Sequence, residues 1–455
     1  MAGRNTGADI ASTATLETRT TFFSPQTLPR THLFWMVIVA LALRLLVMSF
    51  LYPERTDPAR DHWRLGGEAG RIARSIAEGK GFSSPLFADT GPTSWLAPVY
   101  PYLLAGIFKV FGIYSTASAI AALSLDCLFS ALTCISVFLI GKHCFGQRAG
   151  LWAGWIWAFF PFAVYFSADF IWHTALSTLL MSLVFLAALR MERNPNLRSW
   201  VLFGLLSGVG GLTDPIIMSV APALGAWAWL RRYRSGGRWP APGLAAVLAV
   251  SAVVSPWFVR NYRTFHKVIP FRSCLGLELY CGNNADSWHW GPPGYHPSDN
   301  DGEWQQYQQL KEIGYTEKKM QQGLAFISAH RGLYVVQTLR RIVYFWTGFW
   351  SFSHRYLAEE PDDPGNMLLS ILTTVLALMG LWRAFRLRLP SAVPFLLAFL
   401  LFPITYYLTH PEDYYRRPLD PLFVVLAAFA LLAWKHARKR RDVKVETEDL
   451  VVVDF

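Results

Sequence analysis

The feature that most constrains the fold of this chain is a series of long apolar segments. They lie at 33–52, 117–141, 149–167, 170–190, 200–213, 214–231, 242–260, 367–384, 390–409 and 418–434. A helix of about 20 apolar residues is long enough to cross a membrane. Only 16% of the 455 residues are charged, against roughly a quarter in an average soluble protein. The sequence therefore predicts an all-α integral membrane protein with about ten transmembrane helices.

Basic residues cluster at the breaks between alternate apolar segments, at 142–148, 190–198, 231–238, 383–388 and 435–441. If ten helices alternate across the membrane, all of these clusters face one side, and the positive-inside rule makes that side the cytoplasm. The net charge of +11 then marks cytoplasmic loops and not a nucleic-acid surface. The apolar stretch 333–350 is interrupted by Arg340 and Arg341, so it is predicted to be an interfacial or external helix.

This topology divides the chain into a cytoplasmic tail at 1–32, a transmembrane module at 33–260, an external loop region at 261–366, transmembrane helices at 367–434 and a cytoplasmic tail at 435–455. The first external loop is 53–97, and both termini are predicted to lie in the cytoplasm. Within the first apolar segment, Arg44 is costly to bury in a membrane, so it either pairs with a carboxylate or serves a buried or interfacial structural role.

The first predicted external loop concentrates charged side chains. From Glu68 to Glu78 apolar residues recur every three or four positions, which predicts an amphipathic surface helix that ends at Gly79. If helical geometry extends back to Asp61, its carboxylate shares a face with Glu68. A carboxylate at the outer membrane surface can act as a general base. An ordinary charged surface helix with salt bridges has the same pattern, so both interpretations stay open.

Further motifs follow in a characteristic order. They are Pro98-Val-Tyr100-Pro101, Phe111-Gly112, Trp257-Phe-Val-Arg260-Asn-Tyr-Arg263, Gly276-Leu-Glu278-Leu-Tyr-Cys-Gly-Asn283-Asn284 and Tyr415-Arg416-Arg417-Pro-Leu-Asp-Pro421. Together with the first loop they resemble the polyprenyl-phosphate-sugar-dependent glycosyltransferases of the C-type (GT-C) superfamily. This group includes bacterial relatives of the protein O-mannosyltransferases and of the lipid A aminoarabinose transferase. The resemblance covers about residues 33–434.

The resemblance implies a GT-C-type polytopic bundle with external amphipathic helices. It also implies an enzyme of the cytoplasmic (inner) membrane that moves a sugar from a polyprenyl-phosphate donor to a lipid, glycan or protein hydroxyl on the outer face. In such enzymes acidic residues of the first loop lie beside the acceptor, so Glu68 or Asp61 is expected to be the general base, with Asp57 and Asp169 next. The Lys-Pro-Pro segment that contacts the lipid phosphate in some relatives reads Ala97-Pro98-Val99 here, so the cation must come from elsewhere.

Arginine suits the departing phosphate because its guanidinium binds two phosphate oxygens at once and stays charged. The late motif favours Arg416, with Arg260 and Arg263 as the second pair, although external arginines also contact lipid headgroups. The expected substrate-binding residues are Asp57, His62, Tyr100, Asp169, His173, Arg260, Arg263, Glu278, Asn283, Asn284, Tyr415, Arg416 and Arg417.

No cofactor is expected, because phosphate is already a good leaving group and His289, His296 and His354 are scattered along the chain. Cys274 and Cys281 are both external and allow either a disulfide or free thiols. Asp214 precedes Pro215 and is more typical of a helix N-cap than of a ligand. Trp288 and Trp290 can stack on a sugar or lipid, or simply pack their own loop.

Two other functions remain as alternatives. The first is a ligase or polymerase that moves whole lipid-linked glycans, which donor size would distinguish from a single-sugar transferase. The second is a non-enzymatic transporter. Transporters often contain internal repeats with broken helices at matching positions, and the sequence has no such repeat, so transport ranks below catalysis.

Overall fold

The computed structural model describes residues 30–55, 65–193, 196–236, 241–287, 294–359 and 363–451. Within these ranges the regular structure is helical, apart from an isolated β-bridge between Ser83 and Pro92. The predicted site residues Asp57, Asp61 and His62 lie outside the described residues, as do Trp288 and Trp290.

The helices follow the predicted apolar segments closely. They are α2 (Arg30–Arg55), α3 (Gly67–Ala77), α4 (Val99–Phe111), α5 (Thr116–Phe145), α6 (Gln147–Ala158), α7 (Pro161–Asp169), α8 (Thr174–Arg193), α9 (Leu197–Thr213), α10 (Ile217–Arg234), α11 (Ala241–Phe265), α12 (Leu275–Gly282), α13 (Asp301–Ala329), α14 (Arg331–Thr347), α15 (His354–Glu359), α16 (Asp363–Arg386), α17 (Ala392–Leu401), α18 (Ile404–Leu408), the 3-10 helix η2 (Asp413–Leu419) and α19 (Asp420–Val451).

In the described part of the chain, six helices are long and apolar enough to cross a membrane: α2, α5, α8, α11, α16 and the first part of α19 with η2. The pair α6 and α7 makes a seventh if it counts as one span, bent by 43°. The protein is therefore a multi-pass membrane protein. Three of the ten predicted spans correspond to α9, α10 and α17 with α18, which are not among these candidates, so the count of ten stays a prediction.

Small residues allow the helices to approach closely. A Cβ at Gly141 of α5 would lie 2.8 Å from the Cα of Gly150 in α6, and one at Gly380 of α16 would lie 2.2 Å from the carbonyl oxygen of Leu426 in α19. Helices in a membrane associate through such close packing, because lipid tails remove the hydrophobic driving force between them.

The bend between α6 and α7 explains the arginine in the first span. Arg44 is buried, and its guanidinium donates to the carbonyl oxygens of Ala158 (3.0 Å) and Trp157 (3.3 Å) at the break, and to the Ser130 hydroxyl (2.8 Å). The break frees carbonyl groups that need donors inside the protein. Arg44 therefore has a structural role with carbonyl partners, and no carboxylate partner is found among the described residues.

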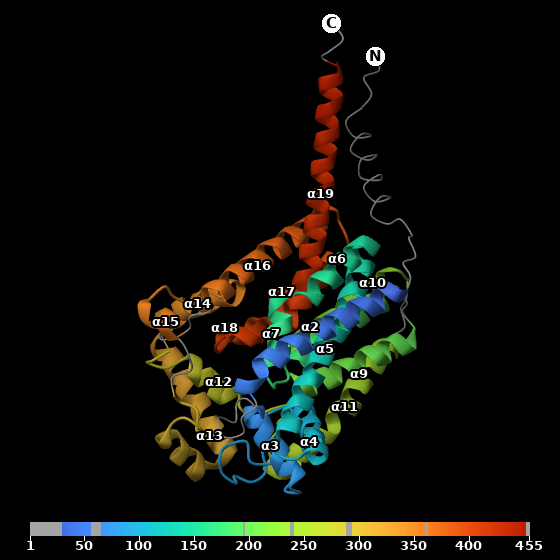
Figure 1. Cartoon of the computed structure of the whole chain (residues 1–455). Coiled ribbons are helices and arrows are strands. Elements are labelled where there is room, and N and C mark those ends of the chain that lie inside the picture. Colours follow the sequence, from blue (N-terminus) through green and yellow to red (C-terminus); the bar gives the residue numbers. More distant parts are fainter. Residues whose placement is uncertain are drawn as a thin grey trace.

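The two ends of the molecule differ in character. In Figure 1, α3, α4, α12 and α13 gather at one end, while α19 projects from the other. Three of the five predicted basic clusters meet: Arg193 at the end of α8 donates to the carbonyl oxygen of His143 in α5 (2.7 Å), and Arg231 of α10 lies 3.0 Å from Glu192 of α8. Clusters far apart in the sequence thus share one side. Helix α19 continues from the last apolar segment into the predicted tail, as far as Val451.

The predicted helix of the first loop is confirmed as α3, but the prediction that it lies on the surface is wrong, because most of its residues are buried. It ends at Ala77, and Gly79 follows with φ of +82°, a conformation that glycine adopts easily. The helix does not continue back toward Asp61, because Gly66 has φ of +91°. The condition under which Asp61 and Glu68 would share a helix face is therefore not met.

Candidate active site

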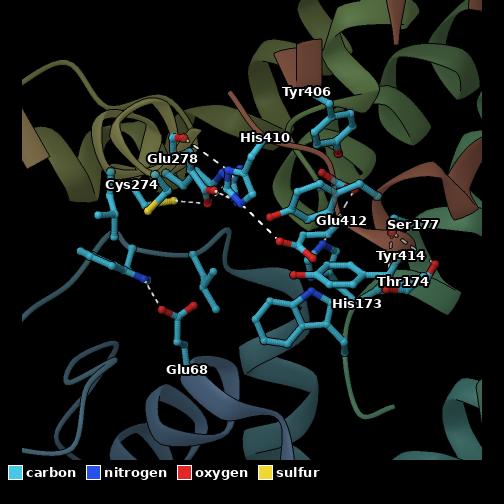
Figure 2. A pocket seen from close by; sticks show the side chains of 18 of the residues that line it. Glu68, His173, Thr174, Ser177, Cys274, Glu278, Tyr406, His410, Glu412 and Tyr414 are labelled. Carbon is cyan, nitrogen blue, oxygen red and sulfur yellow. Dashed lines mark hydrogen bonds and ion pairs between the residues drawn. The ribbon is translucent and has the colours of Figure 1, made fainter. Parts of the chain in front are cut away.

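A polar pocket lies at the end of the molecule that carries α3 and α12, and it encloses about 150 Å³. Separate segments of the chain supply its wall, which includes the titratable side chains Glu68, His173, Asp214, Arg272, Cys274, Glu278, Cys281, His296, Asp299, Tyr406, His410, Glu412, Tyr414 and Tyr415. Figure 2 shows Glu68 on one side of this pocket, with Glu278 and His410 on the opposite side.

Glu68 stands in the first turn of α3 and is buried. Two donors hold the same carboxylate oxygen, Oε1: the indole Nε1 of Trp95 at 2.5 Å and Nε2 of His296 at 2.8 Å. Among the described residues, Oε2 of Glu68 has no hydrogen bond. Burial opposes ionisation, but the hydrogen bonds from His296 and Trp95 and the charge of Arg71 together lower the pKa of Glu68 below its ordinary value.

Arg272 lies in the loop between α11 and α12 and brings a guanidinium to the same pocket. Its side chain is 29% exposed, and its nearest charged partner is Glu278, whose Oε1 lies 3.8 Å from a guanidinium nitrogen. Within the described part of the chain this guanidinium makes no hydrogen bond. An arginine that faces a pocket with its donors uncommitted is suited to bind an anionic ligand.

The opposite wall pairs carboxylates with half-buried histidines. His410, between α18 and η2, lies 3.5 Å from Glu278 and 3.8 Å from Glu412, and His173 lies 3.8 Å from Asp214. Burial lowers the pKa of both His173 and His410, although the neighbouring carboxylates act in the other direction. With these histidines neutral, carboxylates outnumber the cation Arg272 along this wall.

Of the residues predicted from the sequence, the structure brings Glu68, His173, Glu278 and Tyr415 together at the pocket. Tyr100 lies behind the wall: its hydroxyl donates to Asp126 (2.7 Å), and its ring packs edge-on against His173. Asp169 is buried at the end of α7 and does not line the pocket.

The late arginines are not brought to the pocket. Arg416 is buried among α14, α16 and α19, where it donates to the carbonyl oxygens of Trp346 (2.9 Å) and Ser370 (3.5 Å) and to the Thr373 hydroxyl (3.0 Å). Arg417 donates to Asp420 (3.2 Å), and its guanidinium lies over the Phe162 ring. The motif thus directs Tyr415 to the pocket and both arginines into helix packing.

Asn283 and Asn284 close the end of α12. Asn283 donates to the carbonyl oxygens of Leu279 and Leu408, and Asn284 donates to that of Tyr280. Both asparagines are buried, and neither lines the pocket. Their placement indicates a structural contribution to the loop that carries Glu278.

Arg260 belongs to a second, lateral groove of about 530 Å³ between α4 and α11, lined by Pro98, Val99, Tyr102, Leu103, Leu212, Val253, Pro256, Trp257 and Arg260. Its guanidinium donates to the carbonyl oxygens of Phe82 (2.8 Å) and Thr93 (2.5 Å) and lies 5.0 Å from the centre of the Trp257 ring. Arg263, one turn further along α11, is exposed. The groove is almost entirely apolar.

Sequence reasoning missed several pocket residues. Arg272 stands two residues before Cys274, and His410 and Glu412 stand just before Tyr415, so adjacency to the motifs was the available signal. His296 was noted only as an isolated histidine. Asp214 both accepts a hydrogen bond from the backbone of Ile216 (3.3 Å) and lines the pocket.

Within the described ranges, no group of three or more histidine, cysteine, aspartate or glutamate side chains is arranged to hold a metal ion. Cys274 and Cys281 are both buried free thiols, so of the two open alternatives the structure contains the unpaired one.

Residues 95–259 match the sequence profile of the dolichyl-phosphate-mannose-protein mannosyltransferase family. The matched segment covers less than half of the chain. The match to the mannosyltransferase family begins at Trp95, which donates to Glu68, and ends just before Arg260. Glu68, Arg272 and His296 therefore lie outside the matched segment. Among curated proteins, none matches the chain.

Comparison with solved structures shows a similar overall fold. The apo oligosaccharyltransferase of Archaeoglobus fulgidus is similar, with a TM-score of 0.51 and 14% identity over 90% of this chain and 52% of that chain. ArnT from Cupriavidus metallidurans is similar with a TM-score of 0.45 in the apo state (16% identity, 86% and 59% covered) and 0.39 when bound to undecaprenyl phosphate (14% identity, 88% and 77% covered). The chain spans about half the length of the oligosaccharyltransferase.

Proposed function

We propose that this protein is a membrane glycosyltransferase that moves a sugar from a polyprenyl-phosphate donor to an acceptor hydroxyl of a lipid, glycan or protein. The reaction takes place in the pocket between α3 and α12. The proposal is carried by one observation: a carboxylate with an uncommitted oxygen, Glu68, and a guanidinium with uncommitted donors, Arg272, line the same pocket. The match of residues 95–259 to the dolichyl-phosphate-mannose-protein mannosyltransferase family supports the donor class.

The chemistry needs one base and one anion receptor. Oε2 of Glu68 takes the proton of the acceptor hydroxyl. At the same time the hydroxyl oxygen of the acceptor forms a bond to the anomeric carbon of the sugar. The bond between that carbon and the phosphate oxygen breaks, and the electron pair leaves with the lipid phosphate. Arg272 binds the departing phosphate through two parallel hydrogen bonds, which favours the charge that develops there.

The polyprenyl chain needs an apolar path from the membrane to the pocket. The lateral groove between α4 and α11 provides one, because it is open and apolar. Its lining includes Pro98, two residues after the pocket residue Leu96. Arg260 also lines this groove, but its guanidinium is bonded to the carbonyl oxygens of Phe82 and Thr93, so the phosphate is assigned to Arg272. The basic clusters lie at the opposite end of the molecule, which supports a site on the outer face.

A transfer assay in membranes tests this proposal. Candidate polyprenyl-phosphate sugars are supplied, and the glycosylated product is detected by mass. Glu68→Gln is expected to lower the rate by on the order of 10²–10⁴ at near-normal protein abundance. Arg272→Gln is expected to impair turnover, and Arg272→Lys only partly restores it, because a point charge cannot reproduce a two-pronged contact.

Arg263→Gln is the matched control, since this arginine is exposed and lies outside both pockets. Wild-type rates in both Glu68→Gln and Arg272→Gln would overturn the proposal. Consumption of whole lipid-linked glycans, with single-sugar donors ignored, would identify a ligase or polymerase instead.

A further inference from the structure

The contact between Glu68 and His296 joins two parts of the chain that are 228 residues apart. His296 lies in the long segment between α12 and α13, and its side chain is 18% exposed at the pocket wall. Its ring also packs edge-on against Trp95, the other donor to Glu68. The carboxylate is therefore held from two sides, at a single oxygen.

The second ring nitrogen of His296 shows where its proton lies. The backbone N–H of Ser298 donates to Nδ1 of His296 at 3.1 Å. A nitrogen that accepts a hydrogen bond carries no proton, so in the neutral ring the proton is on Nε2, the atom that faces Glu68. His296 is thus arranged as a donor to the carboxylate, and the Ser298 backbone fixes its tautomer.

We propose that His296 is a positioning residue for the general base: its Nε2–H holds Oε1 of Glu68, which leaves Oε2 directed at the acceptor hydroxyl and keeps the carboxylate ionised. The proposal rests on the proposed function, in which Glu68 is the base. His296 itself transfers no proton to the substrate. Its role is the role that a carboxylate plays for the histidine of a catalytic triad, with donor and acceptor exchanged.

Other charged groups near this pair are few. Arg71 lies on α3 itself, and its charge favours the Glu68 anion. Asp299, three residues after His296, favours the charged form of His296. Cys274, Tyr307 and Tyr414 are the remaining titratable neighbours coupled to Glu68, and all three are uncharged near neutral pH. Burial raises the pKa of Glu68, and without the His296 donor the groups that still lower this pKa would be Trp95 and Arg71.

The sign of the pH effect follows. Transfer requires ionised Glu68, so activity falls as the pH drops through the pKa of this carboxyl. Without the His296 hydrogen bond the pKa of Glu68 rises, and the acid limb of the pH profile moves upward. One charge-assisted hydrogen bond is worth about one to two pH units. His296→Gln keeps a side-chain N–H near the position of Nε2 and is expected to reverse most of this shift.

The experiment measures two quantities on the full-length protein in lipid nanodiscs. The first is the pH profile of turnover with the polyprenyl-phosphate sugar that the wild type consumes. The second, which needs no substrate, is the titration of the Glu68 carboxyl by infrared difference spectroscopy, identified as the band that disappears in Glu68→Gln. Wild type, His296→Leu and His296→Gln are compared, with His330→Leu as the control because His330 is exposed at the end of α13.

We expect His296→Leu to raise both the acid limb and the titration midpoint by about one to two pH units, with His296→Gln and His330→Leu near wild type. If Glu68→Gln is inactive and His296→Leu nevertheless titrates and turns over as the wild type does, the positioning role is wrong while the proposed function stands. Full activity of Glu68→Gln would instead show that Glu68 is not the general base, and both proposals would then be wrong.

Discussion

At the scale of single residues, the hydrogen-bond partners of an arginine separate a structural side chain from one that is available to a ligand. Arg416 uses its guanidinium on the carbonyl oxygens of Trp346 and Ser370 and on the Thr373 hydroxyl. Arg272 uses none of its donors on the described residues and faces the pocket. Both have the charge that a phosphate needs, but of the two only Arg272 lines the pocket, with its guanidinium free of hydrogen bonds to the described residues.

The first prediction concerns Arg416. Arg416→Ala leaves buried acceptors without a donor and should destabilise the folded protein by about 3 kcal/mol or more. Arg416→Lys should also be destabilised, because an ammonium cannot reach all of these acceptors. Thermal unfolding in detergent and the KM for the donor are the measurements, with Arg272→Ala as the comparison, expected to retain stability and lose donor binding. If Arg416→Lys has wild-type stability but binds the donor more weakly, the prediction is wrong, and Arg416 of the late motif would be the residue that binds the phosphate.

At the scale of elements, α12 is the short helix that carries Glu278 to the pocket, and a close approach fixes its position. A Cβ at Gly276 would lie 2.0 Å from the carbonyl oxygen of Thr316 in α13, far inside the 3.4 Å at which ordinary contacts begin. The contact is to backbone, so a side-chain movement cannot relieve it. The position of Glu278 and of the preceding Arg272 therefore depends on a glycine at 276.

A Gly276→Ala substitution tests this dependence. The extra methyl should push α12 away from α13, and a displacement of about 1 Å at a catalytic site can cost on the order of 10² in rate. The matched control is Gly106→Ala in α4, where a Cβ would meet nothing within 4 Å. Transfer rate and protein abundance are measured for both. Equal, near-normal rates would show that α12 tolerates the shift and that its placement does not limit the chemistry.

At the scale of the whole molecule, the basic clusters at the ends of α5, α8 and α10 lie on one side of the helical bundle and the pocket lies on the other. The ends of α5, α8 and α10 meet through His143, Arg193, Glu192 and Arg231. Figure 1 places α3 and α12, which border the pocket, at the other end. Basic residues stay in the cytoplasm during membrane insertion, so this arrangement predicts an external pocket.

Cysteine labelling in intact cells tests this orientation. A cysteine placed at Arg386, in the last turn of α16, should not react with a membrane-impermeant thiol reagent. A cysteine at Lys267, an exposed residue just beyond α11, should react. The background should be low because all five native cysteines are buried. The reverse pattern would invert the topology and place the pocket in the cytoplasm.

The sequence by itself determined the class of the protein and the order of its helices. Apolar length and composition predict a membrane bundle, and the spacing from Glu68 to Glu78 predicts α3 with its stop at Gly79, because these signals are local. Helix number was harder to predict. Within the part of the chain that the structure describes, length and apolarity alone identify six or seven spans. Helices α9, α10 and α17 with α18 are shorter or less apolar segments whose depth depends on their neighbours.

Only the tertiary structure decided which polar side chains share the pocket. His296 reaches Glu68 across 228 residues, and Arg272 faces the pocket while the motif residue Arg416 turns into helix packing. No local pattern distinguishes these arginines, because the sequence shows only their charge and their motif context. A guanidinium becomes available to a ligand only when folding leaves it without carbonyl partners. The sequence thus predicted which types of residue the site contains. Which particular residues form it depended on the packing of α3, α12 and the long loop between α12 and α13.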